Sequence, residues 1–578
     1  MKFSSSRSWN GVVLTAIATF LVLPAVASAA DFVLTAPQWG KKQDRAVAAA
    51  GGTVNWSHGK AGIASVSSDN ADFLATVSRN RAFQSAAEDM MVQWQDPNPV
   101  TQANITPDDE WYFGLQWNMQ AIEAPAAWDA GHTGAGVRVA INDGGIDPTH
   151  PDLAPNMDTS CSVSFVPDQP YDTDTGGFWH GMHVAGIVGA ADNGMGVIGV
   201  APEAEMISVK VLHSGSGAFG WIIGGVLYAA DPAAFGRPDC IKADIINMSL
   251  GAVFNKRLLG GGSLVAAMAR AVNYATSKGT LVVSAAGNDG IDLGQAQDIT
   301  FVPAESGSGI AVAATGPVDI FGIFTGTPGD PRAPASYSNY GEGTTFVAAP
   351  GGGDGITALV AVNSPSSIAG FKLAASANYG KRPNGHTGDV ALWSDAADTT
   401  GDPHDACEDG TDPNVAGKIA LIHRGSCTFV TKSAAAEASG AIGVIISNNR
   451  PGPAPGLGGD VPITIPSVGL GQSDGAAIEG ELAGGPVNVS LFETPFPEGV
   501  LDQVLSSCYS GWCFASGTSM ASPAAAGVAA LIKGCNPGIS LGALKAKLAQ
   551  TADDEGKIGN DEFYGHGFVN AARACGVK

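Results

Sequence analysis

Short apolar strands alternate with helical stretches along most of the chain from about Asp109 onward. Residues 137–142 have the apolar pattern of a buried strand, and Asp143 follows them directly. Further strands are predicted at 206–211, 243–248, 280–285 and 310–314. A helical stretch at 263–277 lies between two of them. Strands separated by helices predict a parallel α/β sheet, whose ligands bind beyond the carboxyl ends of the strands. We therefore expect the chemistry to lie just after each strand.

The composition excludes several classes of protein. The 578 residues are 45% apolar and only 15% charged, so the chain can bury a sizeable core and is not of the disordered type. Its net charge of −24 repels phosphate backbones and anionic membrane surfaces. Nucleic acid is therefore not an expected partner.

The N-terminus has the pattern of a secretory signal. Lys2 and Arg7 precede an apolar run at 12–26, which is broken by Pro24 and followed by small residues at 27–30. We predict a signal peptide at 1–29 and export to the extracellular space or the periplasm. No later segment offers about 18 uninterrupted apolar residues, so no membrane span is expected in the mature protein.

All eight cysteines follow this signal, in a compartment that permits oxidation. Proximity and domain membership favour four disulfides: Cys161 with Cys240, Cys407 with Cys427, Cys508 with Cys513, and Cys535 with Cys575.

Residues 30–106 are predicted to form a separate unit. Strands are expected at 32–35, 53–56, 61–66 and 89–94, and helices at 41–50 and 69–77. This βαββαβ order is typical of a ferredoxin-like split fold. The polar, proline-bearing stretch at 95–108 is predicted to be an exposed linker that a protease would cut.

Three sites stand where the sheet predicts chemistry, and each also has an ordinary structural interpretation. Asp143 follows its strand, although Asp-Gly is a common turn pair. His180 and His183 share one helical face, but no Glu follows His180 as in the zinc motif H-E-x-x-H. Ser519 precedes Pro523, which belongs near a helix start, so Ser519 is either an N-cap or a nucleophile beside helical N–H groups.

Taken together, these motifs resemble the subtilisin-like serine proteases, the subtilases. The stretches that carry the resemblance are residues 141–153 around Asp143, 180–186 around His180 and 517–523 around Ser519, supported by 247–251, 284–288 and 564–570. The resemblance implies that Asp143 orients His180, that His180 is the general base and that Ser519 is the nucleophile. It also implies an oxyanion hole formed by Asn288 and the Ser519 N–H, and substrate-binding residues Ser249, Leu250, Gly251, Ala285, Ala286 and Gly287.

Two positions depart from the family pattern. Subtilases usually have Thr or Ser after the catalytic aspartate and Thr within the histidine motif, where this chain has Gly144 and Met182. An inactive scaffold that binds peptides or proteins is therefore kept as an alternative function. An unrelated α/β hydrolase is disfavoured because no G-x-S-x-G elbow surrounds Ser519.

A long insertion divides the catalytic domain into a first part at 107–362 and a second part at 498–578. Residues 363–497 are too many for a structureless loop, and they resemble the protease-associated (PA) domain found as an insert in some subtilases. Strands are expected around 417–429, 440–449 and 463–468, with a helix at 434–439. The insert is interpreted either as a packing module or as a lid that gates the substrate.

The resemblance also implies a structural calcium ion and a regulatory role for residues 30–106. The candidate calcium ligands are Asp109, Asp152, Asp192 and Asn193. Residues 30–106 resemble the inhibitor prodomains of subtilases, so we expect a secreted endopeptidase that acts on proteins or peptides and is inhibited by its own propeptide. The end of that propeptide is expected to pair with 249–251, and the mature protein is expected to be a monomer starting between Gln102 and Asp109.

Overall fold

The computed structural model describes most of the chain after residue 29. The described ranges are 30–93, 110–255, 261–296, 299–318, 330–353, 358–377, 379–394, 402–407, 410–425, 427–450, 454–458, 462–493, 502–509 and 511–577. The predicted signal peptide, the predicted linker and the candidate ligand Asp109 lie outside these ranges. Within them, no helix combines the length and the apolar character needed to cross a bilayer.

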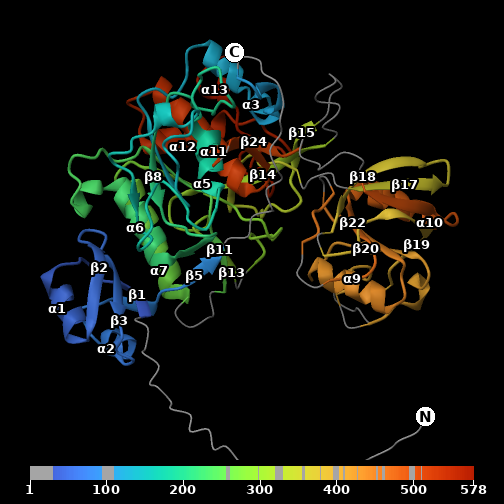
Figure 1. Cartoon of the computed structure of the whole chain (residues 1–578), viewed down its shortest axis with the longest axis horizontal. Helices are drawn as coiled ribbons and strands as arrows, with labels where there is room; N and C mark the ends of the chain where they lie inside the picture. The colour runs from blue at the N-terminus through green and yellow to red at the C-terminus, as the bar shows by residue number, and fades with distance from the viewer. Residues whose placement is uncertain are drawn as a thin grey trace, which may run out of the picture.

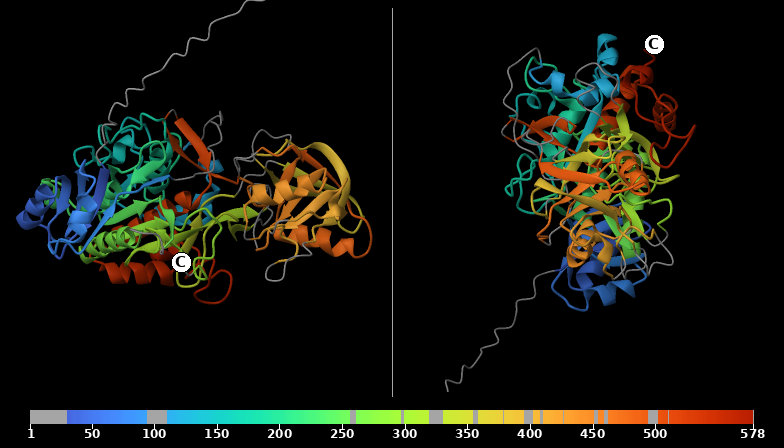
Figure 2. Two further views of the ribbon diagram at one scale, coloured as in Figure 1. Left: turned by 90° about the horizontal axis from the view of Figure 1, so that it is seen from below. Right: turned by 90° about the vertical axis from the view of Figure 1, so that its right-hand side faces the viewer.

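The described chain forms three units in a row (Figures 1 and 2). A small N-terminal unit and a barrel domain lie at opposite ends of a central α/β domain. The barrel domain is inserted in the chain between two parts of the central domain, as the sequence predicts.

The N-terminal unit is a four-stranded sheet in the order β2-β3-β1-β4. Its elements are β1 (Ala30–Thr35), α1 (Lys41–Ala49), β2 (Gly52–His58), β3 (Ile63–Ser68), α2 (Phe73–Ser78) and β4 (Ser85–Glu88). The predicted βαββαβ order is therefore present, but its last strand is β4 and not residues 89–94. Residues 85–88 are small or polar and carry little strand signal, which explains the shift.

The central domain is built on an eight-stranded sheet. The order of its strands is β15-β14-β12-β10-β6-β8-β7, with β16 also beside β14. All pairs are parallel except β14 with β15. The strands are β6 (Arg138–Asp143), β7 (Val163–Ser164), β8 (Glu205–Lys210), β10 (Ile245–Met248), β12 (Leu281–Ala285), β14 (Ile310–Val318), β15 (Asp330–Pro334) and β16 (Thr345–Pro350).

Helices cover both faces of this sheet, because alternate residues of a strand point to opposite sides. Val139 and Ile141 lie in the core beneath α5 (His180–Gly189) and α11 (Thr518–Cys535), which pack against each other. Ala140 lies in the opposite core, beneath α6 (Phe219–Ala230) and α7 (Gly261–Ser277). This arrangement places the starts of α5 and α11 on the same face of the sheet.

The barrel domain is closed in the order β17-β18-β22-β21-β20-β19-β23. Its elements are β17 (Ala358–Ser364), β18 (Gly370–Ser376), β19 (Asn384–Leu392), β20 (Ile419–His423), α9 (Phe429–Ala438), β21 (Gly443–Ser447), β22 (Ser467–Leu470), α10 (Gln472–Leu482) and β23 (Asn488–Glu493). The boundary expected at residue 363 falls inside β17, so the barrel includes residues from Ala358 onward. The boundary expected at residue 497 lies outside the described ranges.

Three small sheets complete the fold: β5 (Met91–Gln93) with β9 (Ser216–Ala218), β11 (Ala252–Asn255) with β13 (Ile299–Val302), and β24 (Val504–Cys508) with β25 (Gly511–Ala515). The other helices are α3 (Trp117–Ala121), α4 (Ala124–Asp129), α12 (Leu541–Gln550) and α13 (Ala571–Ala574), with short 3₁₀ turns at Phe113–Leu115, Ala154–Asn156, Pro232–Phe235 and Pro413–Val415. Disulfides join Cys161 to Cys240, Cys407 to Cys427 and Cys508 to Cys513, three of the four predicted pairs.

Candidate active site

Asp143 and His180 meet in the core of the central domain. Asp143 is the last residue of β6, and His180 is the first residue of α5. Nδ1 of His180 lies 2.9 Å from both carboxylate oxygens of Asp143, and both side chains are buried. The backbone N–H of Gly144 donates to Oδ1 of Asp143 at 2.6 Å. This geometry fixes the imidazole with its Nδ1 proton toward the carboxylate, which leaves Nε2 as the basic nitrogen.

Ser519 lies in the first turn of α11, and its side chain is buried. Its Oγ donates to the carbonyl of Ser249 at 3.3 Å, and the Oγ of Ser249 donates to the carbonyl of Ser519 at 2.7 Å. The second bond explains how α11 tolerates Pro523. A proline has no N–H for the carbonyl four residues earlier, and the Ser249 hydroxyl supplies the missing donor.

Asn288 is held through its amide oxygen. The backbone N–H and the hydroxyl of Thr518 donate to Oδ1 of Asn288 at 2.8 and 2.9 Å, so the two N–H donors of the amide point the other way. Nδ2 is buried and meets no acceptor among the described residues. The amide is therefore oriented by a residue that the sequence analysis did not single out, next to Ser519 in the chain.

The two departures from the family pattern have structural partners. A Cβ added at Gly144 would approach Cδ1 of Phe178 to 2.8 Å, and the Phe178 ring stacks on the ring of His180 with centroids 5.3 Å apart and planes inclined by 15°. Phe178 thus occupies the space of a side chain at position 144. The sulfur of Met182 accepts the N–H of Asp147 at 3.0 Å. Both positions are packed, although no hydroxyl is present.

A buried ion pair lies behind Asp143. Nζ of Lys210, at the end of β8, donates to the carbonyl of Gly144 and lies 3.0 Å from Oδ2 of Asp174. Both side chains are buried. The backbone N–H of Asp174 donates to the hydroxyl of Tyr509 at 2.7 Å. The pair fastens the turn after Asp143 to the segment that leads into His180.

His183 has a structural role and does not form a metal pair with His180. Its Nε2 lies 3.1 Å from the carbonyls of Val504 and Cys513 in the β24–β25 hairpin. Burial lowers the pKa of His183 to about 3, so the ring is neutral at physiological pH.

One residue of each candidate substrate-binding segment contacts the start of α11. Ser249 bonds to Ser519, as described above. Ala285 is the last residue of β12, Ala286 and Gly287 follow it, and the N–H of Gly287 donates to the hydroxyl of Thr518 at 3.0 Å. Leu250 and Gly251 line an apolar pocket together with Leu212, Ile222 and Met268.

Residues of β5 enter this region from the N-terminal unit. The strand pairs antiparallel with β9, so that Val92 lies opposite Gly217 and lines the same apolar pocket. The predicted pairing of the end of the propeptide with 249–251 concerns residues after Gln93, which lie outside the described ranges. Leu250 and Gly251 contribute walls of the pocket that Val92 lines.

The calcium candidates fall into two groups. Asp152 is buried and accepts the N–H of Val197 and of the Trp512 ring with Oδ2, whereas Oδ1 has no partner in the described part of the chain. Asp192 and Asn193 are exposed. Sequence reasoning missed Glu110, which follows the expected ligand Asp109 in the chain.

Glu110 belongs to the same region as Asp152. Its Oε1 accepts the N–H groups of Asn193 and Gly194 at 2.8 Å, and its buried Oε2 has no partner within the ranges given above. Burial raises the pKa of both Glu110 and Asp152. Two bare carboxylate oxygens beside one loop fit a hard cation with oxygen ligands.

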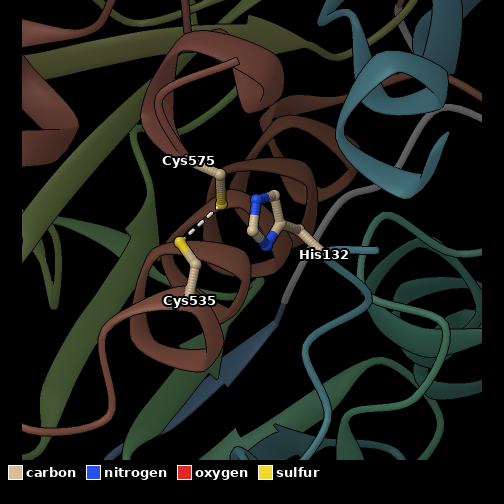
Figure 3. A group of neighbouring side chains, drawn as sticks. All are labelled: His132, Cys535 and Cys575. Carbon is tan, nitrogen blue, oxygen red and sulfur yellow. Dashed lines mark hydrogen bonds between the residues drawn. The ribbon is translucent and has the colours of Figure 1, made fainter. Parts of the chain in front are cut away.

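A separate cluster consists of His132, Cys535 and Cys575 (Figure 3). The sulfur atoms of Cys535 and Cys575 lie 2.6 Å apart, which agrees with the fourth predicted pair being neighbours. Two thiolates bound to one zinc ion, each about 2.3 Å from the metal in a tetrahedral site, would lie farther apart than this. The arrangement therefore favours a bond between the two cysteines over a shared metal ion.

Comparison with known proteins gives two family matches. The profile of the subtilase family (Peptidase S8) matches residues 134–405 and 500–567, and the profile of the PA domain matches residues 357–478. The second match falls on the barrel domain.

Curated relatives match part of the chain. Subtilisin Savinase of Lederbergia lenta is 39% identical over 235 residues, which cover 40% of this chain and 71% of that protein. Subtilisin amylosacchariticus of Bacillus subtilis subsp. amylosacchariticus is 39% identical over 208 residues, which cover 36% of this chain and 48% of that protein. The chain thus spans about half the length of the latter relative.

Among solved structures, the epidermin leader peptide processing serine protease of Staphylococcus aureus aligns with 95% of this chain and 98% of its own. The TM-score is 0.55 and the identity 17%. This likeness concerns the fold.

Proposed function

The chain belongs to the subtilase family, and from this we propose that it is a serine endopeptidase whose catalytic residues are Asp143, His180 and Ser519. The observation that carries the proposal is the contact between Asp143 and His180. The Asp143 carboxylate holds Nδ1 of His180 at 2.9 Å, at the start of a helix that packs against the helix of Ser519. An imidazole held in this tautomer can take a proton at Nε2.

In the proposed reaction, Oγ of Ser519 attacks the carbonyl carbon of the scissile peptide bond and gives its proton to Nε2 of His180. The carboxylate of Asp143 stabilises the imidazolium that results. The carbonyl oxygen becomes an oxyanion, which accepts hydrogen bonds from Nδ2 of Asn288 and the N–H of Ser519. His180 then protonates the leaving amine, and water hydrolyses the acyl-enzyme by the same steps in reverse order.

The proposed substrate is an extended peptide. Ser249, Leu250 and Gly251 would bind it on one side of Ser519, and Ala285, Ala286 and Gly287 on the other. The support for this role is the apolar pocket at Leu250 and Gly251, into which Val92 already reaches from an extended strand. A substrate that also pairs with these segments through its main chain would bind largely independently of its side chains.

Covalent labelling with a fluorophosphonate tests the proposal. The parent protein should be labelled at Ser519 and should hydrolyse casein, whereas Ser519→Ala should lose both properties and keep its fold by circular dichroism. The expected loss of turnover is about a million-fold, which is the magnitude known for the nucleophile of subtilisin itself. A correctly folded parent that is neither labelled nor active would identify the alternative, a scaffold that binds peptides without cleaving them.

We propose that the N-terminal unit is the propeptide of this enzyme and acts as its inhibitor. The pairing of β5 with β9 supports this, because it brings Val92 into the apolar pocket of Leu250 and Gly251, which is proposed to bind the substrate. A carboxylate of Asp89 also accepts the N–H of Gly220 at 2.9 Å, at the start of α6. Negative charge is favoured at that end of a helix. The proposed enzyme is exported, and the proposed mature form is a monomer that starts between Gln102 and Asp109.

We further propose that Glu110 and Asp152 hold a structural calcium ion, with Asp192, Asn193 and the neighbouring Asp109 as additional ligand candidates. The bare oxygens of Glu110 and Asp152 support the site. A bound calcium ion would neutralise buried negative charge and fasten the chain at 110 to the loop at 192–199.

Removal of calcium should therefore lower the melting temperature of the processed protein. Excess chelator is expected to lower it by several degrees, and added calcium should restore it. Asp152→Asn should lower the melting temperature and abolish the response to chelator, while Asp168→Asn, at an exposed turn, should leave the response intact. An unchanged melting temperature of the parent in chelator would contradict the site.

A further inference from the structure

Two arginines of the barrel domain reach the central domain from one rim of the barrel. Arg424 follows β20, and Arg450 lies shortly after β21. These neighbouring strands are parallel, so their carboxyl ends meet at the same rim. Arg450 is only 6% exposed, although an arginine side chain is rarely buried without a specific purpose.

Both arginines bind the same short stretch of the central domain, residues 336–340, which we call the support segment. Nη1 of Arg424 donates to the carbonyl of Ser336 at 2.6 Å, and Nη1 of Arg450 donates to the carbonyl of Ser338 at 3.2 Å. The Arg450 guanidinium also lies over the ring of Tyr340, 4.8 Å from its centroid. The barrel domain thus contacts the support segment through two guanidinium groups.

The support segment in turn holds the loop that contains Asn288. The side chain of Asn339 is buried, and its Oδ1 accepts the N–H groups of Asp289 and Ile291 at 3.1 and 2.9 Å. Its Nδ2 donates to the carbonyl of Ala286 at 3.0 Å. Asn339 therefore holds the backbone both before and after Asn288 in the chain.

Backbone bonds join the same two segments. The N–H of Asn339 donates to the carbonyl of Gly287 at 2.8 Å, and the N–H of Gly290 donates to the carbonyl of Tyr337 at 2.7 Å. Nη2 of Arg424 also lies directly against Gly290 in this loop, so close that a side chain at position 290 would overlap it. A continuous set of contacts thus runs from the barrel domain to the residues on either side of Asn288.

We propose that Arg424 and Arg450 are positioning residues for the oxyanion hole: through the support segment and Asn339, the inserted barrel domain holds Asn288 in the orientation that receives the oxyanion. The inference rests on the proposed protease function and gives the insert a role in the chemical step. It predicts that loosening the two arginines impairs transition-state stabilisation and leaves substrate binding unchanged.

A double-mutant cycle on the full-length protein tests this proposal. Loss of one oxyanion donor costs about 100- to 1,000-fold in kcat, so loosening its support in Arg424→Ala/Arg450→Ala should cost about 10-fold, with KM unchanged for a chromogenic peptide amide. In the Asn288→Ala background the same arginine changes should lower kcat by less than about 2-fold, because the donor they position is gone. The lysine variants Arg424→Lys and Arg450→Lys should recover part of the kcat.

The control is Arg382→Ala, because Arg382 is exposed on the same domain and pairs with Glu493 on its surface. It should keep the parental kcat. An equal loss of kcat in the parent and the Asn288→Ala background would overturn the proposal, as would a change confined to KM. If the alanine variants unfold, the same comparison of kcat in the parent and Asn288→Ala backgrounds is made with the lysine variants. Failure of the protease proposal would be seen separately, as a parent protein that a fluorophosphonate does not label.

Discussion

At the scale of single residues, Gly144 and Phe178 form a matched pair around His180. The ring of Phe178 fills the space that a side chain at 144 would need and stacks on the imidazole. An aromatic face beside an imidazole also attracts the cation that forms when the ring is protonated. The glycine at 144 is thus matched by the Phe178 ring, which leaves no room for a side chain there.

We predict that Gly144→Ser lowers kcat/KM by about 10-fold, because overpacking a filled site costs roughly 1–3 kcal/mol. The loss should be smaller when Phe178→Ala is present as well, since the added side chain then has room. Gly114→Ser is the control, because an added Cβ there meets nothing within 4 Å. Peptide hydrolysis by the parent, the two single variants and the double variant measures the coupling between positions 144 and 178. Full activity of Gly144→Ser with Phe178 intact would contradict it.

The sequence identifies some of these residues and not others for a physical reason. Asp143 and His180 each belong to a sequence motif. Asp143 follows a predicted strand and His180 begins a predicted helix, so their contact at the edge of the sheet could be expected. Phe178 contacts Gly144, Thr518 contacts Asn288 and Glu110 contacts Asn193, and only the folded structure brings these distant parts of the chain close. Their chemical roles, like those of the motif residues, stay predictions until variants are measured.

At the scale of elements, the strands with strong apolar patterns were predictable and the weak ones were not. The buried strands β6, β8, β10 and β12 occur where the sequence predicts them. In the N-terminal unit, by contrast, the fourth strand is Ser85–Glu88, whose small side chains give no strand signal. The more apolar residues after it form β5, in which Val92 is partly buried against the core of the central domain.

Within the barrel domain, His423 joins β20 to two acidic side chains on other elements. Its Nδ1 lies 2.7 Å from Oδ2 of Asp402, and its Nε2 lies 2.9 Å from Oε2 of Glu479 on α10. Burial by itself lowers the pKa of His423, but the two hydrogen bonds and charges outweigh it, so the pKa lies above its usual 6.5. The protonated ring therefore holds α10 and residue 402 to the barrel.

We expect this contact to stabilise the barrel domain at acid pH. A raised pKa in the folded state means that the stabilisation is fully present below pH 6.5 and is lost as the pH rises through the raised value. Hydrogen exchange of α10 in the full-length protein should accelerate over that window beyond its intrinsic pH dependence, and His423→Gln should remove the extra acceleration. His386→Gln is the control, because burial lowers the pKa of His386. Equal exchange profiles in the parent and His423→Gln would contradict the role.

At the scale of the whole molecule, each end unit contacts the central domain close to the candidate active site. The N-terminal unit does so through β5, beside the pocket of Leu250 and Gly251. The barrel domain does so through Arg424 and Arg450, behind the loop of Asn288. The sequence indicated both units from their length and pattern, but not these contacts, because they depend on single side chains that cross from one unit to another.

The contact of β5 leads to a prediction about inhibition by the N-terminal unit. Val92 lines the apolar pocket, whereas its neighbour Met91 is 58% exposed on the other side of the same strand. Full burial of a valine side chain contributes about 1.5–3 kcal/mol, and Val92 is partly buried, so Val92→Asp should weaken inhibition of the processed enzyme by a separately added N-terminal unit roughly 10-fold.

The matched variant Met91→Asp adds the same charge at the exposed position of the strand and should change the inhibition constant by less than about 3-fold, as surface substitutions usually do. Inhibition constants from peptide hydrolysis measure both variants. If Val92→Asp inhibited as strongly as the parent unit, β5 would not supply the inhibitory contact. If both variants were equally weak, charge repulsion from the acidic central domain, and not loss of apolar burial, would be the cause. The difference between two adjacent side chains therefore tests whether the N-terminal unit acts as an inhibitor by filling the pocket proposed to bind the substrate.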